Sequence, residues 1–136
     1  MLELFMARCL VAVSLLNSAV LAQSSANKSL ITGTWRGSSE CIQIDSPCRD
    51  EVNVYRFSEI AGKPNTFTGT ASKIVDEKEV DMGTLEWTYD PEHHALESKI
   101  ARGTFRLVVS GNKMEGTLTL TDNTLYRRIH LERAAK

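Results

Sequence analysis

The densest group of potential metal ligands lies in the segment YDPEHH. It carries Asp90, Glu92, His93 and His94, and imidazole together with carboxylate is a donor set that suits zinc or copper. Adjacent residues of a strand point to opposite faces, so His93 and His94 are poorly placed to share one ion. We therefore interpret this segment as a solvated hairpin turn and predict no metal site.

A second acidic group consists of Asp76, Glu77, Glu79 and Asp81. Lys78 interrupts it, and it lacks the glycine and the ligand spacing of a calcium loop. The sequence shows no nucleophile–base arrangement and no Gly-rich phosphate loop. No carboxylate occupies an alternating apolar position that would raise its pKa for acid catalysis. The sequence thus predicts a protein that is not an enzyme and that uses no cofactor.

Two cysteines, Cys41 and Cys48, are separated by six residues in the segment CIQIDSPC. No histidine lies near either of them in the sequence, which disfavours a metal site, and Asp45 and Pro47 favour a tight loop. Two such thiols pair in an oxidising compartment. We expect a Cys41–Cys48 disulfide that closes a loop over residues 41–48.

The beginning of the chain has the pattern of an export signal. An apolar run over residues 9–22 follows Arg8 and ends with Val20 and Ala22 at the −3 and −1 positions of a cleavage site. The run is short for a bilayer, which needs roughly 20 residues. We predict a cleavable signal peptide over residues 1–22, no stable membrane anchor, and an exported protein that is periplasmic or extracellular.

Length and charge restrict the possibilities for the rest of the chain. The 136 residues include 16 basic and 17 acidic side chains, a formal net charge of −1. A near-neutral chain lacks the basic face that nucleic-acid binding requires, so no nucleic-acid partner is expected. The length predicts a single domain, over residues 31–136, preceded by a flexible segment over residues 23–30.

From residue 31 onward apolar and polar residues alternate, and helical spacing is not sustained. Leu85, Trp87 and Tyr89, for example, are separated by polar residues, which is the pattern of a strand with one buried face. Turn signals rich in Gly, Asp, Asn and Pro separate such runs. The predicted strands cover approximately residues 31–39, 51–60, 65–75, 79–89, 94–101, 103–110, 113–121 and 125–133.

Eight strands joined by short connections are expected to pair as antiparallel neighbours. Such a set can close on itself and thereby remove both sheet edges. We predict an all-β fold, an eight-stranded up-and-down antiparallel β-barrel. A two-sheet sandwich is the alternative, but it usually needs longer crossing connections. A barrel of this size holds its own side chains or one small ligand.

A Gly-Thr-Trp segment over residues 33–35 opens the first predicted strand, and an arginine lies in the last one. This combination resembles the calycin superfamily, which comprises lipocalins, fatty-acid-binding proteins and avidins. The resemblance implies that Trp35 plugs one barrel end and that an arginine packs across its ring. Such a cation–π contact contributes about 0.5–2 kcal/mol. Arg127 is the predicted partner, with Arg128 and Arg133 as alternatives.

Within the calycin superfamily, the layout is most similar to that of the avidins. There is no room after the last strand for the helix of lipocalins, and residues 40–50 cannot hold the two helices of fatty-acid-binding proteins. The chain also resembles small exported bacterial proteins of unassigned function that share this layout. Only Trp35 and Trp87 are present as tryptophans, so no biotin-contacting residue is carried over from the avidins.

Aromatic residues on the predicted inner faces supply a candidate binding site. Plain core packing is the alternative explanation for them, while a small apolar pocket with a polar handle is the functional one. We expect non-enzymatic binding of a small apolar or amphipathic ligand inside the barrel. A protein-interaction or inhibitor module that acts through loops such as 41–48 is the alternative. The candidate ligand-binding residues are Tyr55, Trp87, Tyr89, Phe105 and Arg127.

Overall fold

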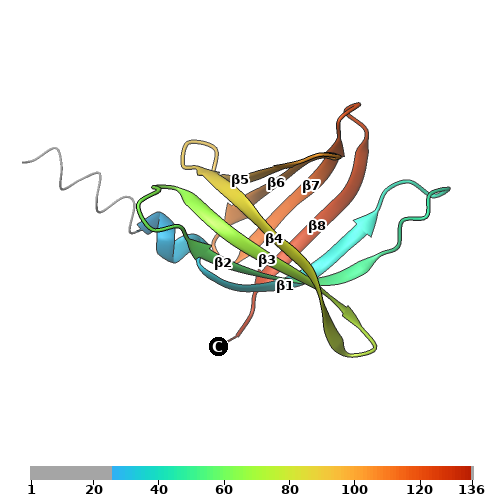
Figure 1. Cartoon of the computed structure of the whole chain (residues 1–136), viewed down its shortest axis with the longest axis horizontal. Helices are drawn as coiled ribbons and strands as arrows, with labels where there is room; N and C mark the ends of the chain where they lie inside the picture. Colours follow the sequence, from blue (N-terminus) through green and yellow to red (C-terminus); the bar gives the residue numbers. More distant parts are fainter. Residues whose placement is uncertain (1–25, 136) are drawn as a thin grey trace, which may run out of the picture.

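The computed structural model describes residues 26–135, so the predicted signal peptide over residues 1–22 lies outside the described residues. Eight antiparallel strands follow one another around a closed barrel (Figure 1). The all-β, up-and-down barrel predicted from the alternation is confirmed. The strands are β1 (Gly33–Cys41), β2 (Glu51–Glu59), β3 (Thr66–Val75), β4 (Lys78–Asp90), β5 (Ala95–Ile100), β6 (Gly103–Ser110), β7 (Lys113–Leu120) and β8 (Leu125–Arg133).

The first and last strands close the barrel. β1 pairs with β2 on one side and with β8 on the other, and both pairings are antiparallel. Because the chain runs up and down, every second connection lies at the same end. The β1 start and the β8 end therefore lie together at one end, which we call the plug end. The opposite end, which carries the β1–β2 and β3–β4 connections, is called the mouth.

A short helix over residues 26–31 precedes β1 at the plug end. The flexibility of the segment over residues 23–30 stays a prediction; within it, residues 26–30 are helical. Ile31, the last helical residue, is fully buried in the barrel core. Its side chain anchors the helix, which is why this segment is ordered although its own sequence is too short to form a stable helix in isolation. Within residues 26–135, no helix is long and apolar enough to cross a bilayer.

Side chains from all eight strands fill the centre of the barrel. Trp87 is fully buried there and needs the space that Gly69 leaves, since a Cβ atom on Gly69 would lie 2.5 Å from the indole Nε1. Tyr55 and Phe57 of β2 point inward and belong to this core. The largest side chains in the core are Trp35, Trp87, Phe57, Phe67, Tyr55 and Tyr89.

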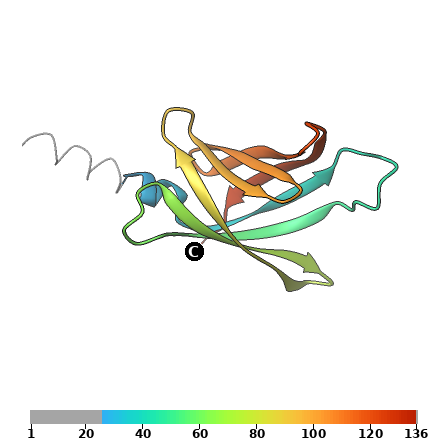
Figure 2. The ribbon, with the colours of Figure 1, turned by 45° about the horizontal axis from the view of Figure 1, so that its top comes forward.

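One seam of the barrel is much shorter than the others. β4 pairs with β3 along its length from Lys78 to Thr88, whereas its ladder with β5 comprises three residue pairs, from Thr88 to Asp90. Both views show β4 and β5 diverging from the turn that joins them toward the mouth (Figures 1 and 2). Below this short ladder, a side-chain bond from the Ser98 hydroxyl to the Glu86 carbonyl, 2.8 Å long, connects the two strands.

Candidate functional site

The plug end is closed by a tryptophan and an arginine. The Arg133 guanidinium lies 4.4 Å from the centre of the Trp35 ring. It also donates hydrogen bonds to the carbonyl oxygens of Thr32 and Leu30, and the Trp35 indole donates to the carbonyl of Ile31 at 2.9 Å. These bonds use carbonyl groups at the end of the short helix, so the contact seals the barrel and fixes the helix at once.

The assignment of Arg127 as the partner of Trp35 is wrong, and Arg133 takes that place. Both arginines lie on the inner face of β8, because they are an even number of residues apart. β8 runs antiparallel to β1, so the start of β1 faces the end of β8, and the register places Arg133 directly opposite Trp35. Arg127 instead lies opposite Cys41, at the mouth.

Three of the predicted ligand-binding residues meet in the barrel. The Trp87 ring lies 6.2 Å from the Tyr55 ring and 5.7 Å from the Phe105 ring. Tyr89 shares the core cluster, but its hydroxyl faces the turn after β4, 3.3 Å from Nδ1 of His94. The structure therefore brings Tyr55, Trp87 and Phe105 together and directs the polar end of Tyr89 away from them.

The aromatic group changes from buried to accessible toward the mouth. Tyr55 and Trp87 are buried, whereas Phe105 remains half-buried on the inner face of β6. Ala71 and Leu85, from β3 and β4, are also only partly buried and pack against the same core. Leu85 belongs to the part of β4 that lies beyond the β5 ladder. The accessible apolar surface of the inner wall thus lies beside the short β4–β5 seam.

Polar inner-face groups surround this apolar surface. The register joins Arg127 to Leu118, Leu118 to Phe105 and Phe105 to Ser98 across three neighbouring pairs of strands. Arg127 therefore lies at the level of Phe105, two strands away around the wall. Burial raises the pKa of the Tyr55 hydroxyl to about 12, with Glu51 raising it further and Arg127 opposing the shift. Tyr55 stays neutral at physiological pH and keeps a hydroxyl that can donate a hydrogen bond.

Arg127 is held by the backbone of the mouth. One guanidinium nitrogen donates to the Ser39 carbonyl, to the Ser39 hydroxyl and to the Arg49 carbonyl, at 3.3, 3.2 and 3.0 Å. The other lies 3.6 Å from the Glu51 carboxylate, and 14% of the Arg127 side chain is exposed. The arginine thus ties the segment after the disulfide to the β1–β8 closure while it keeps some contact with solvent.

The predicted disulfide is confirmed. Cys41 and Cys48 are bonded, and they close the loop between β1 and β2. The loop projects beyond the mouth (Figure 1), and its Ile44 side chain is 97% exposed. Beside it lies a groove of about 510 Å³ between the β1–β2 and β3–β4 hairpins. The groove is lined by Ser38, Glu40, Arg49, Asp50, Glu51, Val52, Lys73, Ile74 and Val75.

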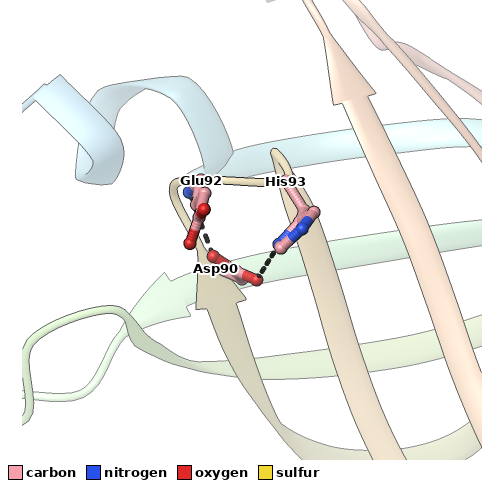
Figure 3. Close-up of side chains that lie close together, drawn as sticks. All are labelled: Asp90, Glu92 and His93. Atoms are coloured by element: carbon pink, nitrogen blue, oxygen red, sulfur yellow. Dashed lines mark hydrogen bonds and ion pairs between the residues drawn. The ribbon is translucent and has the colours of Figure 1, made fainter.

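The turn between β4 and β5 gathers Asp90, Glu92 and His93 (Figure 3). One ligand atom from each lies within 4.8 Å of the other two. The Asp90 carboxylate accepts a 2.6 Å bond from Nδ1 of His93 and a 3.0 Å bond from the Glu92 backbone N–H. The His93 bond, and less strongly the backbone bonds, lower the pKa of Asp90. The side chains of Asp90 and His93 thus bond each other, and His94 contacts Tyr89 instead, so the two histidines engage different partners.

Sequence reasoning missed the contribution of Ala71, Leu85 and Glu51 to the mouth. Leu85 had been placed on a core face by alternation, but the alternation alone gives no signal that a seam opens beside it. Glu51 precedes the apolar part of its strand, where a charged residue is typical of any solvated strand end and gives no sign of a role at the mouth. The signal for Arg133 was present, since antiparallel closure pairs the end of the last strand with the start of the first.

No family model matches the chain, and no curated protein shows significant similarity to it. The class is therefore defined by the structure: a closed eight-stranded antiparallel β-barrel with one disulfide and a tryptophan-plugged end. The fold is consistent with the calycin resemblance of residues 33–35 and the late arginine.

Proposed function

We propose that the protein is an exported, non-catalytic binding protein of calycin-like type that takes a small amphipathic ligand at the mouth of its barrel. The observation that carries the proposal is the half-buried state of Leu85 and Phe105 on the inner wall. Burying such surface under a ligand is favourable by about 25 cal/mol for each Å² removed from water. Since Trp35 and Trp87 fill the barrel interior below this surface, the ligand would bind near the mouth and not deep in the barrel.

Polar groups around this surface suit the other end of an amphipathic ligand. The Tyr55 hydroxyl remains protonated because burial raises its pKa to about 12. Arg127 carries a fixed positive charge that is already shared with backbone carbonyls and Glu51. An apolar floor with a few polar groups at its margin is the usual composition of a small-molecule site. The Cys41–Cys48 disulfide supports export, because disulfides persist in oxidising compartments.

Binding of dodecanoate, followed through tryptophan fluorescence and native mass spectrometry, tests this proposal. The centres of the Trp87 and Phe105 rings are 5.7 Å apart, so the fluorescence of Trp87 should report whether the site is occupied. Leu85→Asp places a charge on the apolar floor and should abolish binding, since an unpaired carboxylate is costly to bury. Val108→Asp is the matched control, because Val108 is an exposed apolar residue on the outer face. Equal binding by both variants, or no binding by the unaltered protein across a series of fatty acids and alcohols, would contradict the proposal.

A second candidate function is protein binding through the disulfide loop. Ile44 is exposed at the end of a constrained loop and stands beside the groove of about 510 Å³. A rigid loop loses less entropy on binding than a flexible one. Pull-down from an envelope extract, with the unaltered protein and with Ile44→Ser, tests this function. A partner that is lost with Ile44→Ser and retained with Leu85→Asp supports loop binding, whereas an identical set of captured proteins argues against it.

A further inference from the structure

The mouth-proximal part of β4 is a strand with one free side. Its ladder with β3 continues from Thr88 to Lys78, but its ladder with β5 ends at Thr88. Within residues 26–135, no other strand pairs with β4 from Lys78 to Leu85 on that side, and at Glu86 the Ser98 hydroxyl bonds the backbone carbonyl. The residues from Lys78 to Thr84 are all exposed. A strand edge of this kind presents backbone N–H and C=O groups that another extended chain can pair with.

Apolar side chains on and beside this free edge are exposed to water, which is energetically unfavourable. Val80 and Met82 are 42% and 44% exposed, and Val75, across the β3–β4 turn, is 43% exposed. All three belong to the hairpin that extends away from the barrel (Figure 2). An exposed edge with apolar residues marks a pairing site more strongly than an exposed edge that is wholly polar.

Charge selects which chain can pair there. Between Asp76 and Glu86 the sequence has five carboxylates and one ammonium group, a formal charge of −4. Glu79 is neutralised by Arg56, whose guanidinium bonds both of its carboxylate oxygens. Glu86 lies 3.9 Å from the Lys63 ammonium group, and a charge of −2 remains. Two copies of this edge would repel each other, because like charges opposite one another destabilise a strand pair. A basic strand would instead be attracted.

A bulge limits the length of the pairing. Met82 has no partner in β3, since Ala71 faces Gly83 while Ser72 faces Asp81. The Gly83 N–H is already satisfied by the Asp81 carboxylate at 2.9 Å. Bulges of this kind interrupt a long flat edge and protect it from indefinite stacking. They leave two short stretches, one on each side of the bulge, that a short segment can use.

We propose that the free edge of β4, from Lys78 to Thr84, binds an extended, lysine- or arginine-rich segment of another protein by strand addition. In this mode the backbone bonds provide affinity and alternate side chains provide selectivity. The net negative charge of the β3–β4 hairpin attracts the basic residues of the incoming strand, and the exposed Val80 and Met82 are available to its apolar residues. The inference uses neither the disulfide loop nor the small-ligand site, so it stands independently of the proposed function.

Hydrogen exchange with two synthetic peptides tests this inference. One peptide alternates lysine with valine, and the other alternates glutamate with valine. Strand addition predicts slower amide exchange between residues 78 and 84 with the lysine peptide alone, because new backbone bonds protect these amides. Protection by both peptides equally, or protection confined to the disulfide loop, would overturn the inference. The same holds if neither peptide protects this edge.

Matched variants separate the two contributions to the affinity. Glu77→Lys combined with Glu86→Lys should weaken lysine-peptide binding about tenfold or more, and the same charge change at Glu115 and Glu132, on β7 and β8, should not. Val80→Ser should also weaken it, whereas Val108→Ser should not, since Val108 is 43% exposed and lies on β6. Identical affinities in a pair of matched variants would overturn the role assigned to that pair. Added salt should weaken the unaltered complex.

Sedimentation of the free protein tests the charge argument. The unaltered chain should not self-associate through β4, and Glu77→Lys with Glu86→Lys should allow β4 to pair with β4 more readily. A dimer of the unaltered protein with slowed amide exchange between residues 78 and 84 would replace the basic partner with a second copy, and so overturn the inference.

Discussion

Each end of the barrel places an arginine from the inner face of β8 beside β1, and the two arginines do different work. At the plug end, Arg133 covers the Trp35 ring and bonds the carbonyls of Leu30 and Thr32. At the mouth, Arg127 has no tryptophan to cover and bonds the backbone of Ser39 and Arg49. The difference shows that the role of an inner-face arginine of β8 depends on its neighbours. Arg133 meets an aromatic ring and closes the barrel end, whereas Arg127 meets backbone carbonyls and holds the segment after the disulfide.

The two ends also differ in how they treat apolar surface. At the plug end, Ile31, Trp35 and Met114 are fully buried. Toward the mouth, the inner wall is only half-covered at Leu85 and Phe105. Of the six large exposed apolar side chains in the described residues, five lie on the two mouth hairpins and their flanking strand ends. These five are Ile44, Val52, Val75, Val80 and Met82. The two ends therefore differ in exposure: these three plug-end side chains are buried, and most of the exposed apolar surface lies at the mouth.

The largest expected effect comes from removing the plug. Trp35→Ala should lower the free energy of unfolding by about 3–5 kcal/mol, because it leaves a cavity under the helix and an unpaired Ile31 carbonyl. Urea unfolding followed by circular dichroism measures the loss. Trp35→Phe, which keeps most of the ring area, should lose less. A loss below about 1 kcal/mol for the alanine variant would show that this end does not hold the barrel together.

Opening the disulfide should have a smaller effect, confined to the mouth. Replacing Cys41 and Cys48 by serine removes a closed loop of about eight residues, which the chain-entropy model values at about 2.5 kcal/mol. Urea unfolding with and without a reductant should show this loss in the unaltered protein and no change in the serine variant. Amide protection at the plug end should fall by no more than the loss of global stability accounts for. A selective loss of protection at Trp35 would contradict the separation of the two ends.

Replacing each arginine by methionine compares the ends directly. Arg133→Met should cost about 2 kcal/mol, because two carbonyls lose a charged donor and the Trp35 ring loses its cation. Arg127→Met should cost about 1 kcal/mol, since its bond to the Arg49 carbonyl is exposed to solvent and its Glu51 contact is 3.6 Å long. Parallel urea titrations measure both losses. If Arg127→Met cost the more, the mouth and not the plug end would carry the critical arginine.

The sequence was sufficient for the barrel because alternation and turn residues specify strands locally. Every predicted strand boundary lies within two residues of the observed one, and the spacing of Cys41 and Cys48 predicted their bond. The candidate site was harder, because period-two alternation places Arg127 and Arg133 on the same face and does not say which end each one reaches. The short β4–β5 seam was not predictable either, since pairing length depends on how neighbouring hairpins diverge in space. Leu85 and Phe105 lie beside the open part of this seam and remain accessible, whereas Trp87 lies next to the paired part and is buried.

The smallest expected effect is that of lowering the pH, which should weaken the β3–β4 hairpin at the mouth without removing any core residue. Glu79, on the β3–β4 hairpin, accepts bonds from both Arg56 guanidinium nitrogens at 2.8 and 2.9 Å and from the Ser72 hydroxyl at 3.0 Å. The Arg56 bonds, followed by the Ser72 bond, lower the pKa of Glu79 from 4.5 to about 2. A carboxyl group whose pKa is lowered by folding stabilises the folded state above its unfolded pKa. That contribution is fully present above the unfolded value near 4.5 and is lost as the pH falls toward 2.

Amide exchange measured between pH 5 and 2 should therefore show the hairpin around Ser72 and Glu79 loosening before the start of β1 at the plug end, because the Arg133–Trp35 contact uses backbone carbonyls and an indole ring and no carboxylate. Glu79→Gln should remove the part of the acid dependence that this carboxylate contributes. Glu77→Gln, on the same hairpin, should leave that part in place, because Glu79 and not Glu77 holds the Arg56 guanidinium. Loosening of the plug end at the same pH as the hairpin would mean that the barrel responds as one cooperative unit. The two ends would then differ in composition but not in stability.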